Sequence, residues 1–584
     1  MNYSGQAELA YKLAELSNKL SSDLPSNTES LEAWLAQLPM LNIDQLLHQV
    51  PSYIQELNQF KLSDKMRFKM LEILRPLVAH ICREIIKRFR NETGLNLSLE
   101  FQEMGWLINV LLREMALGYQ RLLFNKAVKP PRFYNRTDYA ILTERVMFYL
   151  GERITFVYML HAVVPRMIWH DLNSTFRFAR NTKLDVSDVS DDFAFGKANT
   201  NHVTTIYKRI VLLTMLAPYS LRSAEIEGVY LGLLPLIDRV KFTSESPANK
   251  SSYMINWQSE RGPFAAVSET KNPSNLFIDT AEFTSGLTRW VETGQVEEQN
   301  VDHGISIKLL QKILNILDGS LIRKDKRTPV DGRQVEVIVG LQNIEVFLGY
   351  EDAVKDDVDE PMKEIESDEF TINHHWNEKS TKGDWDSLVY NPVDRVSSDT
   401  AKKVVAKTNQ EVEQRRYYFE VENDSAGGVC LRCNSEQAKG LVLGELILIL
   451  GQDLETWTLG IIRWMKVNNK KVDLGVYFLG EQVDFISLSH TVQQSKVARK
   501  VLWLQDPQSA ASLLVPIAQF IPGDVVSTQR KGVELTLMLH EIIWQNEVFS
   551  QFRFELIDIE KKETDSEEET AATEQDYLIP SWEK

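Results

Sequence analysis

The sequence has 584 residues, of which 43% are hydrophobic and 25% charged, which is typical of a globular protein with several domains. Its net charge of -17 argues against duplex nucleic acid as the main partner, because duplex-binding proteins usually present a basic surface. Three cysteines are too few for a disulfide framework and favour a reducing compartment, the cytoplasm. The N-terminus lacks the pattern of a signal peptide, and charged residues interrupt the longest apolar segment, so no membrane span is predicted.

Residues 1–240 are predicted to form a helical bundle or array. In the segment MRFKMLEILRPLVAHICREIIKRF, apolar residues recur at steps of three and four, which places them on one face of a helix. The segment FQEMGWLINVLLREMALGYQRLL repeats this spacing. Further helical stretches are expected near 138–165, 166–181, 201–216 and 222–239.

Residues 241–319 give a mixed signal and are predicted to form an α/β connecting region. MINWQ and NLFIDT have the composition of strands, whereas ISIKLLQKILNIL is an amphipathic helix that ends near Gly319. After this glycine the apolar period changes to two, as in RQVEVIVG. The predicted fold class is therefore multidomain α+β, with an all-α N-terminal half followed by an antiparallel β domain.

The β domain is predicted to span residues 320–500. Its strands are RQVEVIVG, YYFEVE, GGVCLRC, GELILILG, TWTLGIIRWMKV and KKVDLGVYFLG, and IEVFL is expected to continue the sheet. Residues 351–412 are acidic and polar, so we expect a largely disordered insertion there. A small β extension is predicted at residues 501–560, followed by an acidic tail at 561–584. Its strand segments are VARKVLWL, which begins just before residue 501, VELTLMLHEIIW and FSQFRFELID.

Two polar segments at the starts of strands contain the candidate ligand-binding residues. In LIRKDKRTPVDG, Arg323 and Arg327 lie four residues apart. A guanidinium group can pair with phosphate oxygens or with the edge of guanine, and it can stack on a purine. In VENDSAGGV, Asn423 and Ser425 can donate and accept hydrogen bonds, and Gly428 lets the backbone approach a ligand closely. Together these segments would form a two-sided clamp for a guanine nucleotide.

The two segments resemble the motifs of the PilZ family, RxxxR and (D/N)xSxxG. Arg323 and Arg327 match the first motif, and Asn423, Ser425 and Gly428 match the second. The segments GELILILG and WTLGIIRW with VDLGVYF resemble the remaining strands of the family's small six-stranded barrel. The resemblance implies a PilZ-like β-barrel that binds the bacterial second messenger cyclic di-GMP, with no further cofactor and no metal.

In the family, the two arginines grip phosphate and guanine, the Asn and Ser positions contact the guanine edge, and the glycine shapes the turn. The sequence departs from the family in two respects. The long insertion separates the motifs by more residues than is usual, and Ile322 stands where many members have another arginine. The resemblance therefore leaves open whether one messenger or a stacked pair is bound.

Several other residues have alternative interpretations. Arg415 and Arg416 also precede NDSAGG and could substitute for the first motif, although adjacent strand residues point to opposite faces. Arg323 and Arg327 could instead form a solvated basic loop, and Asn423 and Ser425 could be ordinary turn residues. The remaining candidates are expected to be structural or solvated: Cys430, Cys433, His161, His170, His374, His375, Trp457 and Trp464, of which either tryptophan could flank a purine.

The sequence contains no motif of a known enzyme active site, so no catalytic residue is predicted. We expect a cytoplasmic cyclic di-GMP receptor that relays the signal to a protein partner through its helical half. One alternative is a ligand-free scaffold that acts only through protein contacts. A third interpretation, a helical enzyme regulated by the barrel, would require a polar pocket within residues 1–240.

Overall fold

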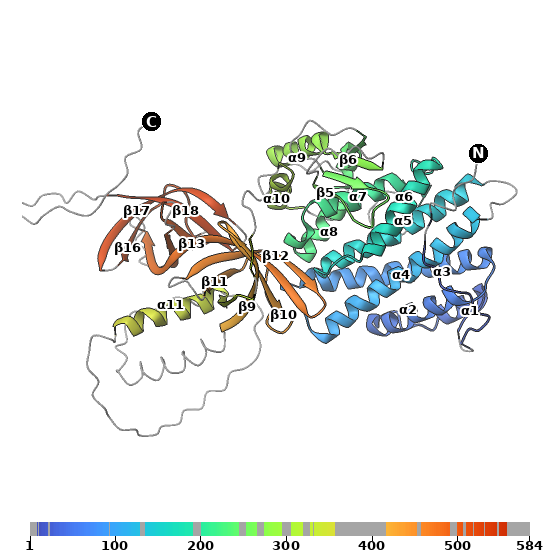
Figure 1. Ribbon diagram of the computed structural model, residues 1–584, viewed down its shortest axis with the longest axis horizontal. Coiled ribbons are helices and arrows are strands. Elements are labelled where there is room, and N and C mark those ends of the chain that lie inside the picture. Colours follow the sequence, from blue (N-terminus) through green and yellow to red (C-terminus); the bar gives the residue numbers. More distant parts are fainter. Residues whose placement is uncertain are drawn as a thin grey trace, which may run out of the picture. The chain divides into compact units, whose positions relative to one another are not determined.

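The computed structural model describes most of the helical and β regions (Figure 1). Among the described residues no helix is long and apolar enough to cross a membrane. The described residues are 9, 11–21, 24–92, 94–128, 135–190, 200–244, 253–265, 274–294, 305–318, 328–330, 332–356, 416–451, 457–490, 499–505, 510–517, 519–530, 532–545 and 548–557.

The N-terminal half is helical, as predicted from the apolar spacing. Its longest helices, α3, α4 and α5, run alongside one another and share one extended apolar core (Figure 1). Polar side chains fix the helix starts: the Ser63 hydroxyl, for example, accepts a hydrogen bond from the Met66 amide at the start of α3. The helices are α1 (Thr28–Leu35), α2 (Ile43–Gln59), α3 (Asp64–Asn91), α4 (Leu99–Val128), α5 (Arg136–Met159), α6 (Arg166–Asn181), α7 (Val203–Met215) and α8 (Ser223–Gly232).

The connecting region contains a small antiparallel sheet and two helices. The predicted strands MINWQ and NLFIDT are β4 (Tyr253–Asn256) and β6 (Asn275–Asp279), and the predicted amphipathic helix is α10 (Ile307–Leu317). The sequence pattern missed α9, which is Ala281–Thr293. The sheet order is β3-β6-β4-β5, where β3 is Lys241–Thr243 and β5 is Phe264–Ala265. Two short strands, β1 (Val189–Ser190) and β2 (Thr200–Asn201), pair with each other.

The next region contains six antiparallel strands whose pairings return to the starting strand, and we call it the first ring. The pairing order is β8-β9-β10-β13-β12-β11, and β11 pairs again with β8. Alternate residues of these strands, such as Val337, Leu431 and Leu474, form a separate apolar core. The strands are β8 (Gln334–Val339), β9 (Arg416–Ser425), β10 (Gly428–Asn434), β11 (Leu446–Gly451), β12 (Thr458–Asn468) and β13 (Lys471–His490).

The prediction that IEVFL continues the sheet is wrong. This segment lies in helix α11 (Leu341–Asp356), which therefore also includes the first six residues of the predicted insertion. Ile344, Phe347 and Leu348 are buried at helical spacing, and the Phe347 ring lies 4.7 Å from the Trp457 ring. A short run of β-branched and aromatic residues fits either period, and here burial against the sheet selects the helix. Residues 357–412 of the predicted insertion lie outside the described residues.

The helical half and the first ring belong to the same compact unit and share several contacts. Leu95 and Leu97, between α3 and α4, belong to the apolar core of the first ring. The backbone of Leu95 exchanges hydrogen bonds with residues 440 and 441. After α5, the amide of Val467 in β12 donates to the carbonyl of His161 at 2.8 Å.

A second compact unit begins at Glu481, within β13. A register shift between Glu481 and Val483 leaves Gln482 unpaired with positive φ of 49°, so a β-bulge lies at this boundary. The predicted strands VARKVLWL, VELTLMLHEIIW and FSQFRFELID are present as β14, β17 and β18. The strands after β13 are β14 (Arg499–Gln505), β15 (Ser512–Pro516), β16 (Val525–Arg530), β17 (Val533–Gln545) and β18 (Phe549–Leu556).

Candidate ligand-binding face

The NDSAGG segment forms a tight hairpin between β9 and β10. Ser425 at the end of β9 lies opposite Gly428 at the start of β10, and its hydroxyl donates to the Gly428 carbonyl at 3.0 Å. This bond is the structural role that the turn interpretation predicted for Ser425. The hydroxyl oxygen keeps its lone pairs, so it can still accept a hydrogen bond from a ligand.

Gly428 is required by the packing of the sheet. A Cβ added at this position would lie 2.2 Å from the carbonyl oxygen of Val476 on β13. Because this neighbour is backbone, no side-chain rotation can relieve the clash. The glycine therefore lets β10 approach β13 and leaves the surface above it without a side chain.

A β-bulge in β9 directs Asn423 and Ser425 away from the core. Asn423 pairs with Cys430, but the next register pair is Val421 with Leu431, so Glu422 is the extra residue. Val421 and Leu431 belong to the core of the first ring. In antiparallel strands opposite residues share a face, so Asn423 lies with Cys430 on the outer face, and Ser425 lies two residues along on the same face.

The strand on the other side of β10 completes this surface. Tyr477 of β13 lies opposite Gly428, and Gly475 lies opposite Cys430. Tyr477 is 45% exposed, which leaves part of its ring available to a ligand. We call this surface the motif face and define it by Asn423, Ser425, Gly428, Cys430, Gly475 and Tyr477.

Two residues of β12 border the motif face. The Trp464 indole packs directly on Gly475, because an added Cβ there would lie 1.8 Å from the indole nitrogen. The guanidinium carbon of Arg463 lies 4.9 Å from the centre of the Tyr477 ring, a cation–π contact. Among the described residues Arg463 forms no ion pair, and burial lowers its pKa without removing its charge.

Acidic residues beside the hairpin are paired with arginines. Arg333 contacts the Asp424 carboxylate at 2.8 Å. Arg432 pairs with both Glu422 and Asp473, and the hydrogen bond that it donates to the Asp473 carboxylate raises the pKa of Arg432. These pairs neutralise the carboxylates closest to the motif face, which reduces the repulsion that an anionic ligand would meet there.

The arginine motif itself is not among the described residues, but the residue that follows it, Thr328, is. Arg323 and Arg327 lie outside the described residues, which resume at Thr328. Thr328 and Pro329 form β7, in which Thr328 pairs with Asp424 and Pro329 pairs with Asn423. The structure therefore brings Asn423, Ser425 and Gly428 together and places the residue after Arg327 against the same hairpin.

The alternative first motif does not fit the observed contacts. Arg416 pairs with Glu336 at 2.9 Å and lies 4.9 Å from the Phe347 ring centre, so its guanidinium is engaged by β8 and α11. Arg415 lies outside the described residues. These contacts remove Arg416 as a substitute for Arg323 or Arg327.

The cysteine and histidine candidates have structural surroundings where they are described. Cys433 faces the core of the first ring, whereas Cys430 lies on the outer face, as the strand period predicts. His161 is buried, and its Nε2 contacts the Leu221 carbonyl at 3.1 Å. His170 Nδ1 lies 3.2 Å from an Asp171 carboxylate oxygen. The described residues contain no cluster of metal-ligating side chains, and His374 and His375 lie outside them.

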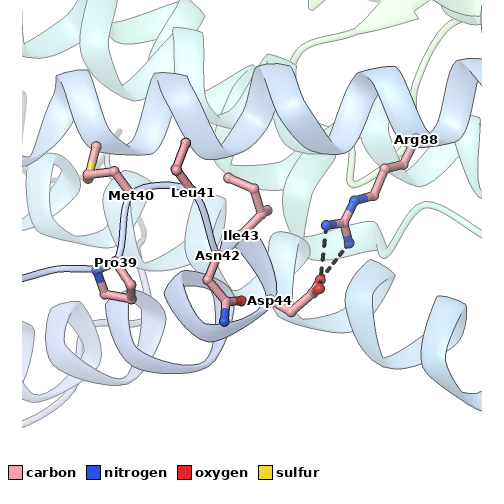
Figure 2. Close-up of a pocket in the computed structure, with 7 residues that line it drawn as sticks. All are labelled: Pro39, Met40, Leu41, Asn42, Ile43, Asp44 and Arg88. Carbon is pink, nitrogen blue, oxygen red and sulfur yellow. Dashed lines mark hydrogen bonds and ion pairs between the residues drawn. The ribbon is translucent and has the colours of Figure 1, made fainter.

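A pocket in the helical half is less suited to bind a phosphate than the motif face. Figure 2 shows that Arg88 reaches across to Asp44, and this ion pair satisfies its charge. The other lining side chains are apolar or an amide, so the pocket lacks a free group for a phosphate. Its lining residues are Pro39, Met40, Leu41, Asn42, Ile43, Asp44 and Arg88.

The sequence identifies the hairpin but not Tyr477 of the motif face or Arg463 at its border. Trp464 was recognised as a residue that could flank a purine, but Arg463 and Tyr477 were not singled out. They lie in different strands, and only the pairing of β13 with β10 brings Tyr477 beside Gly428. The indication of Arg463 available in the sequence is its position next to Trp464 in one predicted strand.

Two family models match successive parts of the chain. Residues 29–248 match a family model described as "Cyclic-di-GMP receptor FimW, N-terminal domain", and residues 253–483 match "Cyclic-di-GMP receptor FimW, middle PilZ domain". The chain is 22% identical over 556 residues to the "Cyclic-di-GMP receptor FimW" of Pseudomonas aeruginosa, covering 90% of each protein. No solved structure matches the chain.

Proposed function

Because the chain belongs to the PilZ domain family, in a long form with a helical N-terminal half, we propose that it is a receptor for cyclic di-GMP. The first ring is then the PilZ barrel, and the messenger binds on the motif face. Arg323 and Arg327 hold phosphate and guanine, while Asn423 and Ser425 contact the guanine edge. The protein is a bacterial cytoplasmic receptor and not an enzyme.

The pairing of β7 with β9 is the observation that carries this proposal. Thr328 pairs with Asp424, and Arg327 precedes Thr328 by one peptide bond. Consecutive Cα atoms are about 3.8 Å apart, so the chain itself keeps Arg327 near the hairpin that contains Asn423 and Ser425. This supports a site in which the end of the first motif lies near the second motif despite the long insertion between them.

The motif face has the shape and charge that a guanine nucleotide requires. Gly428 leaves a gap in the side chains of the face, with Asn423 and Ser425 on one side and Tyr477 on the other, and the Trp464 indole covers Gly475 beside it. A purine can stack on the exposed part of an aromatic ring, and unpaired guanidinium groups can bind phosphate. The Arg463 guanidinium adds a positive charge to those of the two motif arginines.

We further propose that ligand binding is relayed through the helical half to a protein partner. Strand β12 carries Arg463 and Trp464 at the motif face, and two and three residues further on it contacts the helices. Lys466 Nζ lies 5.5 Å from the centre of the Tyr219 ring, and the Val467 amide donates to the His161 carbonyl. A shift of β12 on binding would therefore change these contacts.

One observation favours a second candidate function, a ligand-free scaffold. Ser425 closes the turn, and Gly428 is required by the approach of β10 to β13, so both residues have structural roles without a ligand. A scaffold would keep these roles and bind only proteins.

Calorimetry with cyclic di-GMP on the full chain separates the two functions. We expect saturable binding by the wild type and a loss of at least about 100-fold in affinity in the double variant R323A/R327A, because two charge-assisted contacts disappear. The control R83A/K87A removes two positive charges from α3 and should bind like the wild type. Absence of binding by the wild type would establish the scaffold, and unchanged binding by R323A/R327A would refute the assigned site.

A further inference from the structure

The second compact unit closes a ring of its own, which we call the second ring. It consists of the part of β13 from Glu481 onward and the strands β14 to β18. β13 pairs with β14, β14 with β15, β15 with β18, β18 with β17, β17 with β16, and β16 with β13. Its apolar core is separate from that of the first ring and includes Val501, Leu513 and Phe552.

The two rings have the same strand order. If the strands of each ring are numbered along the chain, both pair in the order 1-2-3-6-5-4, and strand 4 pairs again with strand 1. The strands β8, β9 and β10 of the first ring thus correspond to β13, β14 and β15 of the second. Likewise, β13 is the last strand of the first ring and the first strand of the second.

This correspondence identifies the surface of the second ring that matches the motif face. The row Ser425, Gly428 and Tyr477 of the first ring corresponds to Leu504, Ser512 and Arg553. The register pairs next to this row give a second set of matching positions. Asn423, Cys430 and Gly475 of the first ring correspond to Leu502, Leu514 and Gln551 of the second.

The matching surface of the second ring is closed to a nucleotide. Leu502, Leu504 and Leu514 are at most 2% exposed, and the first two correspond to the polar Asn423 and Ser425 of the first ring. The gap is also filled, because Ser512 replaces a glycine and its hydroxyl accepts a hydrogen bond from Gln551 at 2.9 Å. Buried leucines cannot replace the hydrogen bonds that a guanine edge would lose on leaving water.

The second ring also has no place for an arginine segment before its first strand. In the sequence, Arg323 and Arg327 come before β7 and β8, the first strands described in that part of the chain. In the second ring, the residues that precede Glu481 are already part of β13, and they pair with β10 in the first ring. Neither half of the clamp can therefore be formed by the second ring.

We infer that the second ring is a PilZ-type ring with a closed ligand face, which responds to the messenger through β13 and does not bind it. This inference rests on the proposed function of the first ring. Gly475 and Tyr477 of β13 form part of the motif face, and from Glu481 the same strand pairs with β14. Ordering of β13 by a ligand at the first ring therefore stabilises the first strand of the second ring.

A pair of matched substitutions tests where the messenger binds. Tyr477→Ala removes an exposed ring of the motif face and should weaken cyclic di-GMP binding by about tenfold, the usual effect of losing one stacking contact. Arg553→Ala changes the corresponding residue of the second ring, which pairs with Glu541 on the surface, and should leave the affinity unchanged. Weaker binding by Arg553→Ala, or binding that persists in R323A/R327A, would overturn the inference.

Hydrogen exchange of the full chain, with and without cyclic di-GMP, tests the response. We expect slower exchange in β10 and the first part of β13, and exchange slowed by about threefold or more in β14. R323A/R327A should abolish both effects. Protection of the first ring with no change in β14 would refute the coupling while leaving the receptor intact, whereas no protection anywhere would refute the receptor itself.

Discussion

The two rings differ most on the faces that their common strand order makes equivalent. On the first ring this face carries an amide, a hydroxyl and two glycines, with an arginine stacked on a tyrosine at its border. On the second ring the same positions hold three leucines, a serine, a glutamine and an arginine. The strand order positions these residues, but the side chains on one face decide whether a nucleotide can bind.

The rings also differ in how their first strands begin. In the sequence, two arginines come just before the strands of the first ring, whereas the second ring begins within a strand that already belongs to its neighbour. The proposed clamp uses arginines that come before the first strand, and the residues just before Glu481 are already part of β13. The following substitutions test this difference, from the largest expected effect to the smallest.

Gly428→Ala should destabilise the first ring by more than about 2 kcal/mol, because the new Cβ overlaps backbone and neither strand can yield locally. The added methyl group would lie 2.2 Å from the Val476 oxygen. Thermal or urea unfolding measures the loss, and cyclic di-GMP binding should fall with it. The control Gly228→Ala, within α8, adds a Cβ whose nearest neighbours are 3.9 Å away, so it should keep or slightly raise the stability. Equal stability of the two variants would contradict the close packing of β10 on β13.

Acid should destabilise the helical half through His161, whose imidazole is buried there against the Leu221 carbonyl. Burial lowers the pKa of His161 from 6.5 to about 4. Between these values the unfolded chain binds a proton that the folded chain does not. The stability from this residue is therefore complete above pH 6.5 and is lost as the pH falls towards 4.

Between pH 7 and pH 4 this effect should reduce the free energy of unfolding by about 3 kcal/mol. His161→Asn should remove that part of the pH dependence, since asparagine tolerates the positive φ of 53° at this position. Urea unfolding at both pH values measures the difference. The same acid sensitivity in the variant and the wild type would show that His161 is not the group responsible.

Arg463→Gln should weaken cyclic di-GMP binding by about fivefold to tenfold, because the motif face loses a cation that lies on Tyr477. The matched control is Arg530→Gln in the second ring, where the arginine lies 4.4 Å from the Trp503 ring and pairs with Asp484. This control should lower stability without changing affinity. If both variants bind alike, charge at Arg463 contributes nothing to recognition.

The smallest effect is expected for Ser512→Ala on the closed face of the second ring. Loss of its hydrogen bond with Gln551 should cost about 1 kcal/mol of stability, and affinity for the messenger should not change. Thermal unfolding and calorimetry on the same preparation measure both quantities. A change in affinity would indicate that the second ring takes part in binding.

The two features that the sequence predicted most clearly depend on residues close to one another in the chain. Apolar residues at steps of three and four predicted the N-terminal helices, and alternating residues predicted the strands, because burial of one face imposes those periods on any chain. The motif residues Asn423, Ser425 and Gly428 were also recognisable, since a hairpin keeps them together in the sequence. Arg323 and Arg327 were predicted as their partners, and that prediction stands as part of the proposed site.

Other features depended on contacts between distant segments. IEVFL became a helix because its apolar residues pack on the outer side of the sheet, and no local pattern distinguishes this outcome. Arg463 and Tyr477 joined the motif face only through the pairing of β10 with β13. The second ring could not be predicted for the same reason. Strand order depends on pairings between residues far apart in the chain, and the alternation of residues within each strand does not specify those pairings.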